Sequence, residues 1–362
     1  MKITTFQTRL VHLPNERGLL GEIPGRVDPT FVTLRVRTDE GTEGISYAGY
    51  AGYTAGMARA LQATVEALLE QAIGRDPFET DAIGAQLRTA NGGASPAGLV
   101  TRASSAIDVA LWDIKGKAVG LPCWKLMGGN SNRVRAYGSG HLWRHYSLAE
   151  LAEWAPRLVD AGFRAVKLRC GGESVANDVE RMRVVREAVG PDVEIKVDVN
   201  QLPTVHDALR LARALERYEL SWFEDPTHFQ DFAGQARIAD ALDTPVCSGE
   251  YHYGLAPFRQ LLESRSVDIV MPDLFRVGGF TQFLKVAHLA EAFNLPVASH
   301  LATELFVHAM AAIPNGLTTE HVAWTNSLFK EVPRIEPGGW LAIPDGPGLG
   351  LEFDDDRIAK MA

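Results

Sequence analysis

Residues 1–47 alternate between apolar and polar side chains, which is the period of a strand with one buried face. The segment FVTLRVRTDEGTEGISYAG keeps this alternation on both sides of Asp39-Glu40-Gly41 and predicts an antiparallel hairpin. From residue 54 to residue 90 the apolar positions, such as Leu61 and Val65, recur at helical spacing. The N-terminal part is therefore expected to form an α+β unit.

A Gly- and Pro-rich stretch, PNERGLLGEIPGRVDP, separates the first strand from the hairpin. It is consistent with a surface loop and equally with a flap over a ligand, since long loops in compact domains often act as lids. Residues 49–53, which are rich in Gly and Tyr, could form a similar flap or simply begin the next helix. As lids, residues 14–29 and 47–53 would set substrate specificity, with Ile23 and Tyr47 as substrate-binding candidates.

From residue 134 onward, short runs rich in Val, Ile and aromatic residues alternate with amphipathic helical segments. A strand, its helix and two loops occupy about 25–30 residues, and right-handed units of this kind build a parallel sheet that closes after eight strands. The expected strands are VRAYGSG (134–140), FRAVKLRC (163–170), VEIKVDVN (193–200), LSWFEDP (220–226), TPVCSGE (244–250), VDIVMPD (267–273), LPVASH (295–300) and LTTEH (317–321).

The fold class predicted from this order is α/β, a TIM-type (β/α)7β barrel with an N-terminal α+β capping domain that the C-terminal tail completes. We expect the capping domain in residues 1–128, the barrel in 129–325 and the returning tail in 326–362. The length of 362 residues accommodates a barrel of about 250 residues and a smaller domain. With 46% hydrophobic and 22% charged residues, the chain is expected to bury a sizeable core.

The net charge bears on the class of partner, and the cysteines bear on the cellular compartment. A net charge of −9 and a pI near 5.6 argue against nucleic acid, because phosphate binding needs a basic face. Cys123, Cys170 and Cys247 are widely spaced and form no CxxC pair, which suits the reducing cytoplasm. The N-terminus resembles a strand more than a signal peptide, and no run approaches about 18 apolar residues, so no membrane span is expected.

Three acidic residues at the ends of neighbouring predicted strands form the first candidate site. Asp198 and Glu224 are 26 residues apart (224 − 198), and Glu224 and Glu250 are again 26 apart (250 − 224). The carboxyl ends of barrel strands meet at one mouth, so the three side chains are expected to converge. Like charges that close repel one another unless a cation lies between them, and oxygen-only ligands favour Mg²⁺ over zinc or copper.

A cationic pair, Lys167 and Arg169, ends the second predicted strand. The period of two places both side chains inside the barrel mouth, facing the acids. Burial and a neighbouring cation lower the pKa of a lysine until its neutral amine acts as a base, so Lys167 is the candidate base. Arg169 stays charged and is a candidate clamp for a carboxylate.

Asp273 and His300 end the sixth and seventh predicted strands, and a carboxylate beside an imidazole makes an acid/base unit. Glu320 ends the eighth strand; protonated it would hydrogen-bond a substrate oxygen, and ionised it would form a salt bridge at the barrel end. Further substrate-binding candidates, each with a structural alternative, are Ser139 and His141 at the end of the first strand, Asn200 beside Asp198, and Arg276 near the dyad.

This constellation resembles the enolase superfamily and, within it, the mandelate racemase subgroup of the mandelate racemase and muconate lactonizing enzyme family. The resemblance covers nearly the whole chain, including the A-x-D-x-A-x-W-D segment at 106–113 and the IPDGPGLG tail at 343–350. It implies Mg²⁺ on Asp198, Glu224 and Glu250, Lys167 as base on one substrate face, the Asp273–His300 dyad on the other, and Glu320 hydrogen-bonded to the substrate carboxylate. The usual K-x-K is K-x-R here, and Arg276 stands where a lysine is common.

The resemblance implies Mg²⁺-dependent removal of the proton α to a carboxylate, which gives an enediolate. The first expectation is loss of water from a small-molecule sugar acid, an aldonate or aldarate, because relatives with this dyad mostly resemble acid-sugar dehydratases. A racemase or epimerase of a 2-hydroxy acid, a cycloisomerase of a sugar-derived lactone or anhydro acid, and a non-catalytic binding module are the alternatives. Such barrels commonly form symmetric homo-oligomers, so one is expected here.

Overall fold

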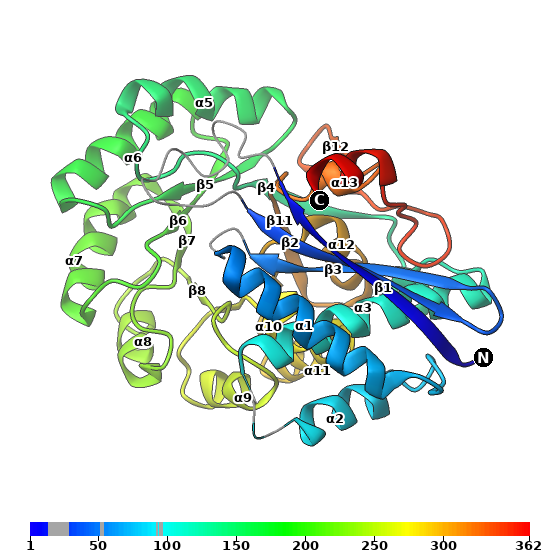
Figure 1. The fold of residues 1–362 in the computed structure, drawn as a ribbon. Coiled ribbons are helices and arrows are strands. Elements are labelled where there is room, and N and C mark those ends of the chain that lie inside the picture. Colours follow the sequence, from blue (N-terminus) through cyan, green and yellow to red (C-terminus); the bar gives the residue numbers. More distant parts are fainter. Residues whose placement is uncertain (14–28, 51–53, 92, 94–96) are drawn as a thin grey trace.

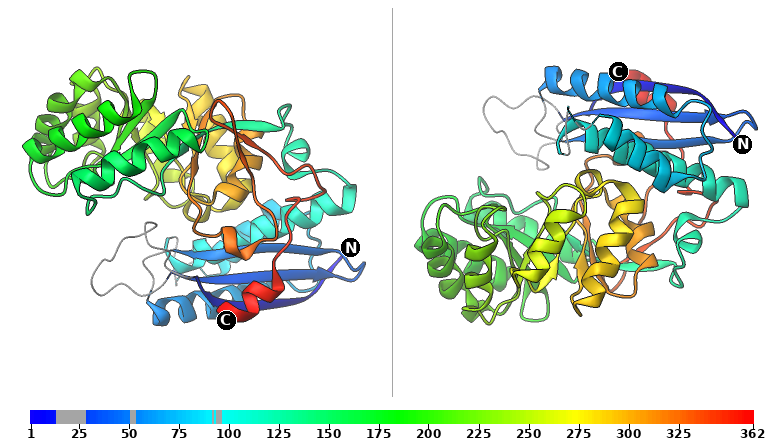
Figure 2. Two further views of the ribbon diagram at one scale, coloured as in Figure 1. Left: turned by 90° about the horizontal axis from the view of Figure 1, so that it is seen from above. Right: turned by 90° about the horizontal axis from the view of Figure 1, so that it is seen from below.

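The structure is a computed structural model that describes residues 1–13, 29–50, 54–91, 93 and 97–362. Within this part of the chain a parallel barrel lies beside an α+β cap, and both termini lie on the cap (Figure 1, Figure 2). The lid candidates at 14–28 and 51–53, Ile23 among them, fall outside the described residues. No helix in the described ranges combines the length and the apolar character that crossing a membrane requires.

Eight parallel strands in the described residues close into the barrel, because β11 at one end of the sheet pairs with β4 at the other. They follow the eight predicted runs, so the (β/α)7β prediction is confirmed. Their bounds are β4 (Arg133–Gly138), β5 (Ala165–Arg169), β6 (Glu194–Asp198), β7 (Leu220–Glu224), β8 (Val246–Ser248), β9 (Ile269–Val270), β10 (Val297–Ala298) and β11 (Gly316–His321).

Helices cover the outside of the barrel and bury their apolar stripes against the strands (Figure 1). Several begin at a side chain that accepts a hydrogen bond from the first turn, as Ser147 does in a capping box with Glu150. The helices are α5 (Leu148–Asp160), α6 (Val175–Val189), α7 (Val205–Leu215) with η1 (Glu216–Tyr218), α8 (Phe232–Ala239), α9 (Ala256–Glu263), α10 (Leu274–Val277), α11 (Gly279–Ala292) and α12 (Thr303–Ala312).

The cap consists of a meander of three antiparallel strands with helices packed on it. The predicted hairpin is confirmed, since β2 and β3 pair in register from Thr30↔Tyr50 to Arg37↔Glu43. Helix α3 contacts both β3 and the barrel helices α10 and α11, and so it joins the cap to the barrel. The cap elements are β1 (Ile3–His12), β2 (Thr30–Thr38), β3 (Glu43–Tyr50), α1 (Ala55–Ala72), α2 (Thr80–Ala90), α3 (Leu99–Val119) and α4 (Cys123–Leu126).

The C-terminal segment returns to the cap, as predicted (Figure 2). The buried carboxylate of Asp113 on α3 accepts hydrogen bonds from the backbone N–H of Ile45 at 2.9 Å and of Leu349 at 2.8 Å, and pairs with Lys117 at 2.6 Å. One side chain thereby ties the cap sheet, α3 and the tail together. The tail elements are η2 (Asn326–Leu328), β12 (Ile335–Glu336), β13 (Trp340–Ala342), which pairs with β4, and α13 (Asp355–Met361).

Candidate active site

The three predicted metal ligands lie at the carboxyl ends of adjacent strands. Asp198 and Glu224 are register partners at the ends of β6 and β7, and Glu250 follows the end of β8 by two residues. All three side chains are buried. The regular interval in the sequence therefore becomes a row of carboxylates along one rim of the barrel.

Lys167 on β5 is fully buried among these acids. Its Nζ lies 2.8 Å from Glu224 Oε1, 2.7 Å from Glu320 Oε1 and 3.5 Å from Asp198 Oδ2. Burial and Arg169 lower the pKa of Lys167, but the carboxylates of Glu224, Glu320 and Glu250 outweigh them and raise it. The expectation of a lowered lysine pKa is wrong for this arrangement, because it counted the neighbouring cation and not the summed field of the acids.

Arg169 is the last residue of β5, two residues after Lys167, and its side chain lies on the same inner side of the barrel. Its Nη1 pairs with Asp198 Oδ2, its Nη2 lies 3.9 Å from Glu320 Oε1, and its guanidinium stacks 4.9 Å from the centre of the Trp143 ring. Arg169 thus pairs with a carboxylate of the protein itself, from a position that also faces the barrel mouth.

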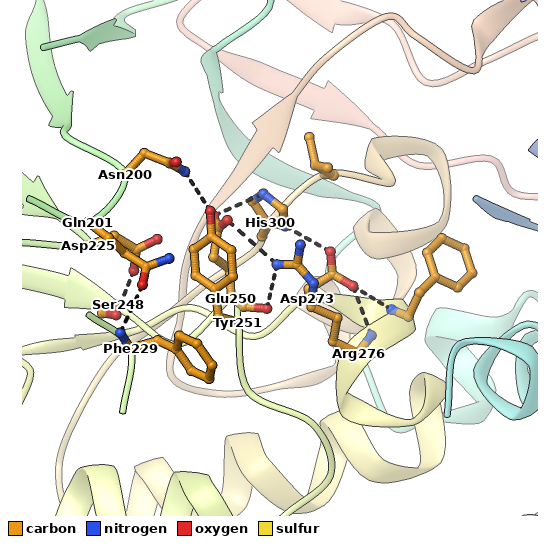
Figure 3. A network of polar contacts seen from close by, with 12 residues as sticks. Asn200, Gln201, Asp225, Phe229, Ser248, Glu250, Tyr251, Asp273, Arg276 and His300 are labelled. Carbon is orange, nitrogen blue, oxygen red and sulfur yellow. Dashed lines mark hydrogen bonds and ion pairs between the residues drawn. The ribbon is translucent and has the colours of Figure 1, made fainter. Parts of the chain in front are cut away.

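Across the barrel, β9 and β10 bring Asp273 and His300 together (Figure 3). Asp273 Oδ2 lies 2.8 Å from His300 Nδ1, and Asp273 Oδ1 caps α10 by accepting the backbone N–H of Phe275 and Arg276, each at 2.9 Å. The imidazole reaches Glu250 Oε2 with Nε2 at 2.9 Å. Burial lowers the pKa of His300, yet Glu250 and Asp273 raise it to about 10, so the ring is an imidazolium here.

Glu320 at the end of β11 is an ionised hydrogen-bond acceptor. Its Oε1 accepts from Ser139 Oγ at 2.5 Å and its Oε2 from the backbone N–H of Leu301 at 2.7 Å. Burial raises its pKa, but Lys167, His300 and Arg169 together lower it to about 2. Glu320 therefore forms the salt bridge that was one of its two expected roles, and its hydrogen bond to a substrate oxygen stays a prediction.

The remaining substrate-binding candidates divide into two groups. Ser139, Asn200 and Arg276 adjoin the acids: Ser139 holds Glu320, the Asn200 backbone N–H donates to Asp198 Oδ1 at 2.8 Å, and Arg276 Nη1 donates to the Glu250 carbonyl oxygen at 2.8 Å. His141 instead stacks on Trp154 of α5, with ring centres 4.1 Å apart, and contacts Tyr146. The sequence signal could not show this stacking partner, which lies in the following helix.

Tyr47 reaches the barrel from β3 of the cap and lines a pocket beside Asp273. Its hydroxyl lies 3.4 Å from Thr325 Oγ1, which in turn donates to Glu304 Oε1 at 2.7 Å. Most of the pocket lining is aromatic or aliphatic, and sequence reasoning did not predict it, because the lining residues come from the cap and from several segments at the barrel mouth. They are Phe31, Tyr47, Gly49, Arg102, Asp273, Phe275, Leu301, Ala302, Val322, Trp324 and Thr325.

The donor set fits a hard divalent cation, although in the described residues no three His, Cys, Asp or Glu side chains converge on one point. The carboxylates of Asp198, Glu224 and Glu250 are turned instead toward the cationic groups of Arg169, Lys167 and His300. Asp225, next to Glu224, keeps a buried Oδ2 without a hydrogen-bond partner among the described residues. Its pKa is raised well above the ordinary value, first by burial and then by the neighbouring carboxylates of Glu250 and Glu224.

Family models match most of the chain. The model described as the N-terminal domain of mandelate racemase and muconate lactonizing enzyme matches residues 23–128, and the one described as enolase C-terminal domain-like matches residues 150–357. L-Talarate/galactarate dehydratase of Salmonella typhimurium is 33% identical over 92% of this chain and 84% of its own. 3,6-Anhydro-alpha-L-galactonate cycloisomerase of Streptomyces coelicolor is 32% identical over 99% of both chains.

Solved structures of similar proteins share the whole architecture. A racemase from Streptomyces coelicolor with bound magnesium superposes with a TM-score of 0.93 at 32% identity and covers 99% of both chains. L-Talarate dehydratase from Polaromonas, complexed with Mg and L-glucarate, has a TM-score of 0.90 at 33% identity and covers 99% of this chain and 96% of its own. The cap, the barrel and the tail are therefore one shared fold.

Proposed function

Because the chain belongs to the mandelate racemase and muconate lactonizing enzyme family of the enolase superfamily, we propose that it removes the α-proton of a sugar acid and eliminates water from it. The supporting observation is a pair of buried proton carriers from well-separated parts of the barrel, Lys167 on β5 and His300 two residues after β10, with the row of acids between them. A planar enediolate needs proton carriers on its two faces.

Asp198, Glu224 and Glu250 would hold Mg²⁺, the ion named with the similar solved structures. Bound there, Mg²⁺ would stabilise the negative charge that develops on the substrate carboxylate. With their acids drawn toward such a cation, the Lys167 amine and the His300 imidazole are available to exchange protons with the substrate. Asp273 keeps the proton of His300 on Nδ1, so that Nε2 is the atom that faces the reaction.

Dehydration assigns different tasks to the two carriers. Lys167 takes the α-proton, and the His300 imidazolium gives its Nε2 proton to the β-hydroxyl that leaves as water, which yields a 2-keto acid. Arg169 and Ser139 both contact Glu320, and we place the substrate carboxylate on this side of the site. Relatives named as L-talarate/galactarate, arabinonate and D-xylonate dehydratases support a polyhydroxylated acid as substrate.

A cycloisomerase of an anhydro or lactone sugar acid is the second candidate. The pocket beside Asp273, with Phe31, Phe275 and Trp324 in its lining, favours a less polar, cyclic substrate over an extended polyol. Two curated relatives that match 99% of their own length are cycloisomerases, of 3,6-anhydro-alpha-L-galactonate and of D-galactarolactone. In this reaction the ring oxygen, and not a hydroxyl, would accept the proton of His300.

One experiment separates these functions. The protein is incubated with Mg²⁺ and a set of aldonates, aldarates and their anhydro or lactone forms in D₂O, and the products are followed by NMR. A keto acid from an open-chain substrate supports dehydration, and one from a cyclic substrate supports cycloisomerisation. Deuterium at the α-carbon without a keto acid indicates a racemase or epimerase, and no exchange with any acid contradicts the proposed chemistry. The division of the chain at 128/129 and 325/326, the symmetric homo-oligomer and the cytoplasmic location stay predictions.

A further inference from the structure

Trp222 is a buried side chain that no step above uses, yet it contacts one of the carboxylates. Trp222 and Glu224 are two residues apart on β7, so both point into the barrel, with Trp222 one layer below the mouth. The indole Nε1–H of Trp222 donates to Glu224 Oε2 at 2.9 Å, and both side chains are at most 1% exposed. A buried hydrogen bond to a carboxylate is stronger than one between neutral groups.

The indole ring is held from two sides, which fixes the direction of its N–H. The Tyr137 ring of β4 meets it edge to face, with centres 5.2 Å apart and planes at 89°. The Lys196 ammonium of β6 lies 4.5 Å from the ring centre on the π face, where a cation is attracted to an indole. The direction of the N–H from which Glu224 accepts its hydrogen bond is therefore set by the packing of side chains from three strands.

The hydrogen bond leaves the two oxygens of Glu224 with different partners. Oε2 is occupied by the indole, whereas Oε1 faces Lys167 Nζ at 2.8 Å, and Asp198 Oδ2 lies 3.5 Å from the same ammonium. A cation that replaced this ammonium between the two acids would meet Oε1. We propose that Trp222 is a positioning residue, whose indole N–H holds Oε2 of Glu224 so that Oε1 is presented to the divalent cation.

This inference rests on the proposed metal site, and its test separates the two. Trp222→Phe keeps an aromatic ring but removes the N–H together with part of the fused ring, so a control that loses the same atoms is needed. Trp112→Phe is the matched control, because the indole of Trp112 on α3 also donates one hydrogen bond of 2.9 Å, to Thr281, and also has a lysine ammonium, that of Lys115, over its ring. The dissociation constant of Mn²⁺ is measured for both variants by electron paramagnetic resonance of the free ion, with Mn²⁺ as the probe.

Loss of a hydrogen bond that orients a metal ligand weakens metal binding by about 10- to 100-fold, and this is the expected change for Trp222→Phe. Trp112→Phe is expected to bind Mn²⁺ as the natural protein does. Equal affinity of both variants would overturn the role of Trp222. A natural protein that binds no Mn²⁺ would instead refute the proposed function, which is a different result.

A second measurement uses the natural protein and so does not depend on whether a variant folds. The chain has 7 tryptophans, and each gives one indole N–H signal in a spectrum of the protein labelled with ¹⁵N-tryptophan. A cation on Glu224 Oε1 lies close to the Trp222 N–H, so substoichiometric Mn²⁺ is expected to broaden one indole signal first and Mg²⁺ to shift that same signal. If no indole signal responds to either ion although Mn²⁺ binds, the hydrogen bond does not orient a ligand and the inference is wrong.

Discussion

Asp273→Asn exchanges one oxygen of the dyad carboxylate for an NH₂ group, and the surrounding hydrogen bonds decide how the new amide is oriented. Oδ1 accepts the N–H groups of Phe275 and Arg276, which begin α10, so the amide oxygen must stay on that side. The amide NH₂ then faces His300 Nδ1, from which the carboxylate accepted a hydrogen bond at 2.8 Å. The variant therefore keeps the helix cap and forces the neutral imidazole to carry its proton on Nε2.

A histidine in that tautomer cannot accept a proton at Nε2, and its imidazolium form loses the carboxylate that stabilised it. Exchange of the same kind in a serine protease triad lowers turnover by about 10⁴, so we expect a loss of about 10³–10⁴, or about 4–5.5 kcal/mol of barrier at 1.36 kcal/mol per factor of ten. Both capping hydrogen bonds remain, so any loss in the free energy of unfolding should come from the buried carboxylate–imidazolium pair and not from the helix cap.

The assay is keto acid formation from the acid that the natural protein turns over, with urea unfolding measured in parallel. Asp268→Asn is the control, because Asp268 stands at the opposite end of the same strand, where its Oδ2 accepts the Val246 N–H at 2.8 Å. That variant should keep its turnover. If Asp273→Asn retains more than about a tenth of the natural turnover, a loss of under about 1.4 kcal/mol, His300 does not depend on an oriented carboxylate and the assignment of the dyad is refuted.

Three further predictions follow from other parts of the structure. Chelation of divalent cations should lower turnover by at least about a hundredfold and added Mg²⁺ should restore it, whereas turnover that resists a chelator contradicts the three-carboxylate site. Asp113→Asn removes an acceptor from a buried ion pair that two backbone N–H groups share, so urea unfolding should show a loss of about 3–5 kcal/mol; an unchanged midpoint would mean that the tail is held elsewhere. His308 is buried against the Leu349 carbonyl oxygen, and burial lowers its pKa to about 4 from an ordinary 6.5. Its contribution to stability is therefore complete above pH 6.5 and is lost as the pH falls toward 4, by about 2 kcal/mol at pH 5, so unfolding of His308→Gln should depend less on pH between 7 and 5 than that of the natural protein.

Periodicity in the sequence determined the architecture and the order of the acidic residues along the rim of the barrel. The spacing of 26 residues between Asp198, Glu224 and Glu250 equals one strand–helix unit, and the ends of parallel strands share one edge, so these acids lie on the same rim of the barrel. The period of two likewise placed Lys167 and Arg169 on one face. Such regularities are local, because they follow from the repeat of a single strand or helix. This is why the positions of the eight strands could be predicted.

Charge states and partners were decided only by the tertiary structure. Lys167 keeps a raised pKa and Glu320 a lowered one because each feels the summed field of groups from other strands. His141 stacks on Trp154, and the pocket lined by Phe31 and Trp324 lies where the cap and the barrel mouth meet. Electrostatic and packing energies depend on distances between residues that are far apart along the chain, and no spacing within the sequence contains those distances.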